Sequence, residues 1–193
     1  MRFLIFIVTF AALFALTVGF LALIDALPEP ALSEDASNRT GPAVSEQTEA
    51  PVRIVAESID MDVKVNNPVS TEIKVLDEAL LTGAVRYPNS ALLGQEGTVL
   101  IFGHSSYLPV IYNQAYKAFN NIQKLKAGDT VSVYSGSREY RYRVTGVRLA
   151  NATEDVVELP SNGKYLTLVT CDSFGRKTDR FVVTAEFAGS TAL

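Results

Sequence analysis

Residues 164–187 read KYLTLVTCDSFGRKTDRFVVTAEF, and this stretch decides the fold. Two runs of alternating residues, 164–171 and 180–187, flank a polar loop that contains glycine, which is the pattern of two strands joined by a turn. If the strands pair antiparallel, Cys171 and Arg180 are the two residues that close the loop 172–179. Alternation along the second strand assigns one face to the core and Arg180 to the other; the core residues are Phe181, Val183, Ala185 and Phe187.

Similar short runs, broken by Gly, Asn, Pro and Asp, fill the chain upstream of this pair. They cover residues 52–59, 61–67, 98–104, 129–136 and 138–149. Seven or eight such strands predict a mostly β protein, closed or nearly closed into a barrel and rich in antiparallel pairs. One or two short helices are expected, near Asp77–Ala84 and Tyr112–Ile122.

The N-terminal region has a different character. Residues 3–24 carry no charge, and a helix of about 22 residues reaches roughly 33 Å, enough to cross a hydrocarbon core of about 30 Å. A cleaved signal peptide is the alternative, but its apolar region spans only about 7–15 residues. Arg2 precedes the run and acidic residues follow it, which favours a cytoplasmic N-terminus. We therefore expect residues 1–25 to be a single-pass anchor in the cell membrane.

The next segment predicts a stalk. Residues 26–50 are rich in Pro, Ser, Glu, Asp and Ala and contain few large apolar side chains to bury. We expect them to be flexible and to hold residues 51–193, the folded domain, outside the cytoplasm and away from the lipid.

Composition excludes two further possibilities. The net charge is −4 and no long Lys/Arg cluster occurs, so nucleic acid is not an expected partner. The chain has a single cysteine, so no internal disulfide can form and the thiol has some other role.

Cys171 and His104 are the only residues of their types, and each ends an apolar run. Taken alone, a single cysteine is more often a small buried hydrophobe, and a single histidine is more often structural. Together they match thiol catalysis, in which a thiolate attacks and an imidazole transfers protons. Arg180 then supplies the permanent charge and fixed donors that stabilise an oxyanion.

These residues resemble the sortases, cysteine transpeptidases of bacterial cell surfaces. The resemblance lies in TLVTC at residues 167–171, an arginine at position 180 and an upstream strand that ends in Gly103-His104. It implies an eight-stranded β-barrel with Cys171 as nucleophile, His104 as proton-transfer partner and Arg180 as oxyanion stabiliser. By the same resemblance, Thr170 assists contacts with the substrate.

The resemblance also implies a reaction. A sorting signal of the LPxTG type near the C-terminus of an exported protein is cleaved, a thioester forms on Cys171, and an amine of a peptidoglycan precursor or a pilin resolves it. No metal site and no cofactor are expected, although some family members bind calcium. Three departures concern the subclass. Ser105-Ser106 stands where many sortases have Arg, the stretch 105–122 is longer than the minimal link to the next motif, and no Asp-Pro-aromatic lid motif occurs in the N-terminal segment.

Two other interpretations remain. The first is a membrane-tethered, non-catalytic β-barrel module for adhesion or scaffolding, in which Cys171 is a buried core thiol. The second is another cysteine hydrolase or transpeptidase. L,D-transpeptidases carry a Gly-Cys-x-Arg signature and papain-like enzymes place Cys before His, and neither pattern fits this order of residues.

Overall fold

The structure is a computed structural model that describes residues 48–106, 108–151, 159–173 and 176–193, with side chains omitted at 171–179. Within residues 1–47 it describes five positions, all helical: Ile5, Ile7, Phe10, Phe14 and Leu16. Nearly all of the expected anchor and stalk therefore lies outside the described residues. No helix among those described is long and apolar enough to span a membrane. The chain divides into two compact units, Met1–Val44 and Ser45–Leu193.

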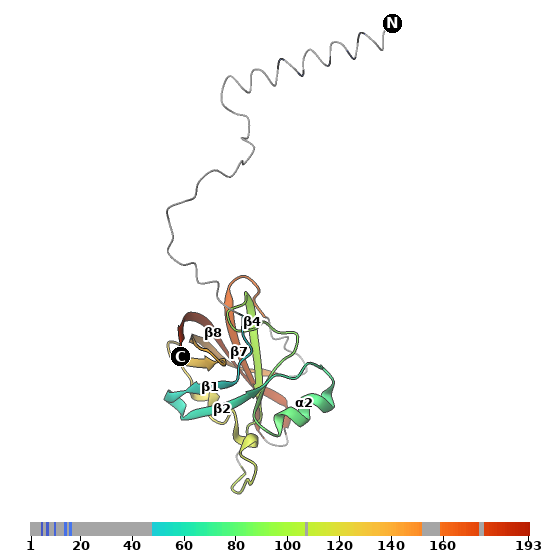
Figure 1. The fold of residues 1–193 in the computed structure, drawn as a ribbon. Coiled ribbons are helices and arrows are strands. Elements are labelled where there is room, and N and C mark those ends of the chain that lie inside the picture. Colours follow the sequence, from blue (N-terminus) through green and yellow to red (C-terminus); the bar gives the residue numbers. More distant parts are fainter. Residues whose placement is uncertain are drawn as a thin grey trace. The chain divides into compact units, whose positions relative to one another are not determined.

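Within the described part of Ser45–Leu193, eight strands form a closed barrel in the order β1-β2-β3-β4-β7-β8-β6-β5 (Figure 1). Their bounds are β1 Arg53–Ala56, β2 Met61–Asn66, β3 Ala84–Arg86, β4 Gly97–Gly103, β5 Thr130–Tyr134, β6 Arg138–Asn151, β7 Lys164–Ser173 and β8 Arg176–Ala192. The predicted barrel and its preference for antiparallel pairs are confirmed. Two pairs are parallel, β2 with β3 and β4 with β7.

The first predicted helix is shifted along the chain. Helix α2 spans Ile73–Leu80, whereas the sequence placed it at 77–84. It ends early because the chain must pass close to β2 before it enters β3. A Cβ at Gly83 would clash with the backbone carbonyl of Lys64, so this crossing requires glycine.

The second predicted helix, 112–122, is wrong as a continuous element. Its place is taken by two 3₁₀ turns, η2 Gln114–Lys117 and η3 Ile122–Lys124. Asn113 caps the first turn by accepting a hydrogen bond from the Ala115 N–H, and Asn121 has a φ of 71°. A left-handed residue at this point interrupts any α-helix. A further 3₁₀ turn, η1, covers Glu57–Ile59 between β1 and β2.

The barrel core follows the alternation of the strands. On β8, Val183 and Ala185 are buried in the main core, and Phe181 and Phe187 pack against it, as the alternation predicted. Val182 belongs instead to a smaller cluster on the opposite face of the strand, with Val169 of β7 and Ala150 of β6. Residues of β7 and β8 thus pack on both faces, which fixes the register of these central strands.

Candidate active site

His104 and Cys171 extend two neighbouring strands. Strands β4 and β7 lie side by side (Figure 1). They are parallel, and their register runs from Gly97 opposite Lys164 to Gly103 opposite Thr170. His104 and Cys171 are the next residues on each strand. Neighbouring strands lie about 4.8 Å apart, so the backbones of these residues meet at one end of the barrel. They are far apart in sequence, and only the parallel pairing brings them together.

Arg180 lies on the third strand of this set. Strand β8 pairs antiparallel with β7, and Cys171 is opposite Arg180, as the sequence predicted. Arg180 is exposed at the strand surface. The predicted loop 172–179 was too long, because β7 continues to Ser173 and β8 begins at Arg176. Arg176 is therefore paired with Ser173 in the ladder rather than placed in the middle of a loop.

Thr170 joins the ends of β4 and β7 through its side chain. Its hydroxyl donates a hydrogen bond of 2.8 Å to the Gly103 carbonyl, and the residue is 2 % exposed. The bond lies one residue before both His104 and Cys171. Thr170 therefore fixes the relative position of the two backbones, and its predicted contact with the substrate stays a prediction.

The backbone before and at His104 is packed against Phe119. The His104 carbonyl accepts a hydrogen bond of 2.8 Å from the Phe119 N–H. A Cβ at Gly103 would come within 2.9 Å of the Phe119 ring, whose side chain is fully buried. Glycine at 103 thus allows β4 to pack directly against the Phe119 ring. This contact and the hydrogen bond to Phe119 fix the position of the His104 backbone.

The imidazole of His104 is half-buried and stacks on Tyr116, with ring centroids 5.0 Å apart and an interplanar angle of 28°. Burial lowers the pKa of His104 below its usual value, and the negative charge of Asp77 on α2 opposes this shift only in part. The neutral imidazole is therefore favoured at pH 7. That form is the one that can accept a proton from a thiol or an amine.

The two residues after His104 are buried serines. Ser106 is held by a reciprocal pair of hydrogen bonds with Asn120: its N–H donates to Asn120 Oδ1 at 2.8 Å, and Asn120 Nδ2 donates to the Ser106 carbonyl at 2.9 Å. Ser105 is 8 % exposed and Ser106 1 % exposed.

An apolar pocket is lined by residues of the segment that follows His104. Its volume is about 370 Å³, and its lining residues are Ser106, Leu108, Val110, Ile111, Tyr112, Asn113 and Tyr116. Tyr116 is shared between this pocket and the stacking contact with His104. The pocket therefore adjoins the histidine.

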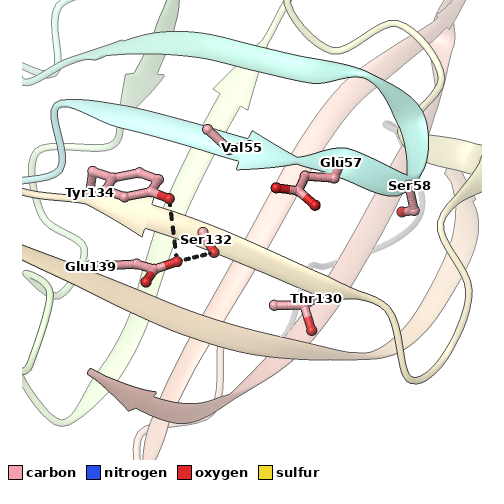
Figure 2. Close-up of a pocket in the computed structure, with 7 residues that line it drawn as sticks. All are labelled: Val55, Glu57, Ser58, Thr130, Ser132, Tyr134 and Glu139. Carbon is pink, nitrogen blue, oxygen red and sulfur yellow. Dashed lines mark hydrogen bonds between the residues drawn. The ribbon is translucent and has the colours of Figure 1, made fainter. Parts of the chain in front are cut away.

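A second pocket, of about 300 Å³, is polar and lies elsewhere on the barrel. Figure 2 shows its lining residues, Val55, Glu57, Ser58, Thr130, Ser132, Tyr134 and Glu139, on β1, η1, β5 and β6. Two of its hydroxyls face Glu139, which accepts hydrogen bonds from Ser132 at 2.7 Å and Tyr134 at 3.3 Å. None of the seven is Cys or His, and neither β1 nor β5 neighbours β4 or β7 in the barrel. We therefore place the candidate site at His104 and Cys171.

No group of three or more His, Cys, Asp or Glu residues is arranged to hold a metal ion in the part of the chain that the structure describes.

Sequence reasoning missed the residues that surround His104, namely Tyr116, Phe119 and Asp77. Tyr116 and Phe119 lie in the stretch that was expected to be one helix, and Asp77 lies on a different helix altogether. Nothing in the local sequence pattern marks them, because their role depends on packing across the barrel end. A single aromatic residue in a loop carries no such information.

Comparison with known proteins agrees with this geometry. The family model described as "Sortase domain" matches residues 54–188. Sortase A of Bacillus anthracis is 33% identical over 132 residues, which cover 64% of this chain and 58% of that protein. The chain thus matches somewhat more than half the length of this relative.

Solved structures give the same result at the level of the fold. Sortase A of Listeria monocytogenes aligns with a TM-score of 0.57 at 25% identity, covering 75% of this chain and 92% of that one. The sortase D5 transpeptidase of Clostridium perfringens aligns with a TM-score of 0.55 at 24% identity, covering 72% and 79%. The family model spans most of the chain and includes His104, Cys171 and Arg180, and the chain therefore belongs to the sortase family.

Proposed function

We propose that this chain is a membrane-anchored cysteine transpeptidase that cleaves a C-terminal sorting signal of exported proteins and transfers the acyl group to an amine. The observation that carries the proposal is the register of three adjacent strands. Gly103 pairs with Thr170, directly before His104 and Cys171, and Cys171 pairs with Arg180. A thiol, an imidazole and a guanidinium at one end of three neighbouring strands are the groups that acyl transfer requires.

In the first step, the sulfur of Cys171 attacks the carbonyl carbon of the scissile peptide bond. The thiol proton passes to the neutral imidazole of His104 and then to the nitrogen of the leaving amine. The guanidinium of Arg180 donates hydrogen bonds to the oxyanion of the tetrahedral intermediate. The carbon–nitrogen bond breaks, which leaves a thioester on Cys171 and a free amine.

In the second step, an acceptor amine attacks the thioester. His104 takes a proton from the attacking nitrogen and returns it to the departing sulfur, so a new amide forms and the thiol is restored. We expect the sorting signal to be of the LPxTG type and the acceptor to belong to a peptidoglycan precursor or a pilin. The steps need no metal or organic cofactor.

The cellular placement is part of the proposal. The uncharged run 3–24, with Arg2 before it and acidic residues after it, supports a single membrane span with residues 51–193 outside the cytoplasm. A domain on that side meets both exported proteins and cell-wall amines. Residues 26–50 would then be the stalk between the membrane span and the folded domain.

Mass spectrometry of the trapped intermediate tests the proposed function. The full-length chain, purified in mild detergent, is incubated with a library of sorting-signal peptides in the absence of an amine. We expect an adduct with the mass of the N-terminal peptide fragment on Cys171, which hydroxylamine releases. The matched control is Cys171→Ala, for which we expect unchanged circular dichroism and no adduct.

Two results would contradict the proposal. Turnover by a folded Cys171→Ala protein would exclude a thioester. If no peptide forms an adduct and the native chain resists alkylation by iodoacetamide until it is unfolded, Cys171 is a buried thiol and the protein is a non-catalytic barrel module.

A further inference from the structure

The apolar pocket beside His104 has no role in the steps described above. It adjoins the imidazole through Tyr116, and Ser106, which begins it, lies two positions after His104. A group in this pocket would lie on the histidine side of the reacting bond. That is the side on which His104 must meet the leaving amine in the first step and the acceptor amine in the second.

The wall of the pocket is chemically uniform. Its apolar and aromatic side chains are Leu108, Val110, Ile111, Tyr112 and Tyr116. Its serine and its asparagine form hydrogen bonds within the protein. Ser106 Oγ accepts from the Leu108 N–H at 3.4 Å, and Asn113 accepts from Ala115 N–H at 3.0 Å and donates to the Leu81 carbonyl at 2.9 Å. The backbone amides of a peptide ligand would find few hydrogen-bond partners in this pocket, whereas a hydrocarbon chain would be stabilised by burial.

Several of the lining side chains are open to solvent. Leu108 is 44 % exposed, Val110 67 % and Tyr112 96 %. They follow one another closely along the segment 108–112, and large apolar side chains that cluster in this way at a pocket mark a binding surface rather than a packing element. The surface is continuous with the catalytic end of the barrel through Tyr116.

A carboxylate that acts on His104 complements an amine. Asp77 of α2 is the carboxylate whose negative charge acts on the His104 ring. The end of α2 is tied to the pocket by the Asn113 to Leu81 hydrogen bond. An ammonium group that approaches His104 is attracted by this carboxylate, while the carbons attached to it lie toward the apolar wall.

We propose that this pocket binds the aliphatic stem of the acceptor, so that the acceptor amine is a lysine-like primary alkylamine rather than a compact glycine amine. The inference rests on the proposed transpeptidase function, because it assigns the second substrate of that reaction. It adds Leu108, Val110 and Ile111 as residues that determine acceptor specificity.

A series of simple acceptors tests the assignment. The acyl-enzyme of the full-length chain is formed with one fixed sorting-signal peptide and then mixed with ethylamine, propylamine, butylamine or pentylamine, which carry the same ammonium group and have similar basicity. The ratio of amide product to hydrolysed product is measured for each, so that differences in acylation do not enter. We expect the ratio to rise about fourfold for each methylene that the pocket buries.

Variants locate the effect. In Val110→Ser and Leu108→Ser the dependence on chain length should become shallow, because the wall no longer offers apolar surface. The matched control is Val69→Ser, an equally apolar side chain that is 98 % exposed and lies outside the pocket. This control should keep the full dependence.

The outcomes separate the two proposals. A flat series in the native chain, or an unchanged slope in both pocket variants, overturns the acceptor assignment while acyl-enzyme formation still supports the transpeptidase. Failure to form any acyl-enzyme overturns the proposed function, and this assignment with it.

Discussion

Cys171 and Arg180 face each other as partners in the antiparallel ladder of β7 and β8. Directly opposed residues in such a ladder have Cβ atoms roughly 4.5–5.5 Å apart, a distance that an arginine side chain readily spans. In the proposed reaction this pairing places a guanidinium next to the oxygen that becomes negative. Arg176 pairs with Ser173 instead, farther along the hairpin.

The pairing predicts that the two arginines differ in function. Arg180→Ala should lower kcat by about a hundred- to a thousand-fold, the usual loss for one oxyanion donor, and Arg176→Ala should lower it far less. Steady-state kinetics of both variants on one sorting-signal peptide check this. Arg180→Lys keeps the charge but not the fork of donors, so it should recover only part of the rate. Equal losses in the two alanine variants would show that the assignment of Arg180 is wrong.

His104 should titrate below its usual range. Burial lowers its pKa from 6.5, and Asp77 raises it in part. Because the chain has one histidine, its ring protons give a single, unambiguous NMR titration. We expect a midpoint below 6.5 in the native chain and a still lower one in Asp77→Asn. Glu78→Gln, the neighbouring carboxylate, is the control and should leave the midpoint in place.

The same shift predicts how stability depends on pH. The folded state binds fewer protons at His104 than the unfolded state, so this contribution to stability is complete above a pH of about 6.5 and is lost as the pH falls toward the folded pKa. Urea unfolding of the native chain and of His104→Gln at several pH values measures it. The difference in unfolding free energy between the two proteins should be constant above about pH 7 and should change as the pH falls below it. A difference that is independent of pH would contradict the lowered pKa.

Gly103→Ala should destabilise the barrel through the Phe119 ring. The added methyl would lie 2.9 Å from a ring carbon, and overpacking of this kind costs about 1–3 kcal/mol. Gly146→Ala is the matched strand control, since its new Cβ would meet Thr184 Oγ1 at 3.6 Å, an ordinary contact. Chemical denaturation compares the two. Adding Phe119→Leu should recover part of the loss in Gly103→Ala, and an absence of any recovery would place the strain elsewhere.

Thr170→Val should cost stability and activity together. The substitution keeps the shape of a side chain that is 2 % exposed but removes the hydrogen bond to the Gly103 carbonyl. We expect a loss of about 1 kcal/mol in the free energy of unfolding. Because the bond joins the strands that carry His104 and Cys171, kcat should fall more than KM rises. Thr170→Ser, which keeps the hydroxyl, should retain most of the rate; if it behaves like the valine variant, the methyl group is the important part.

The strands were predictable because alternation is a local property of the chain. The run 129–136, for example, alternates buried and more exposed side chains that can be read residue by residue. The hairpin of β7 and β8 was equally predictable from the sequence, since its two strands are consecutive and few residues separate them. The pairing of Cys171 with Arg180 followed directly from that hairpin.

The helical segments were less predictable because tertiary contacts decide them. The end of α2 depends on the passage of Gly83 over Lys64, and the break between η2 and η3 depends on the left-handed conformation of Asn121. Neither the close approach of Gly83 to Lys64 nor the conformation of Asn121 leaves a periodic signal in the sequence.

The sequence by itself determined the composition of the site: one thiol, one imidazole and an arginine, each at the edge of an apolar run. Only the tertiary structure decided that His104 and Cys171 lie side by side, because the parallel pairing of β4 and β7 joins segments that β5 and β6 separate in the sequence. It also decided the state of His104, since the stacking of Tyr116, the packing of Phe119 and the charge of Asp77 all come from residues outside β4. Burial and electrostatic interactions depend on what lies nearby in space, and a linear pattern of residues does not contain that information.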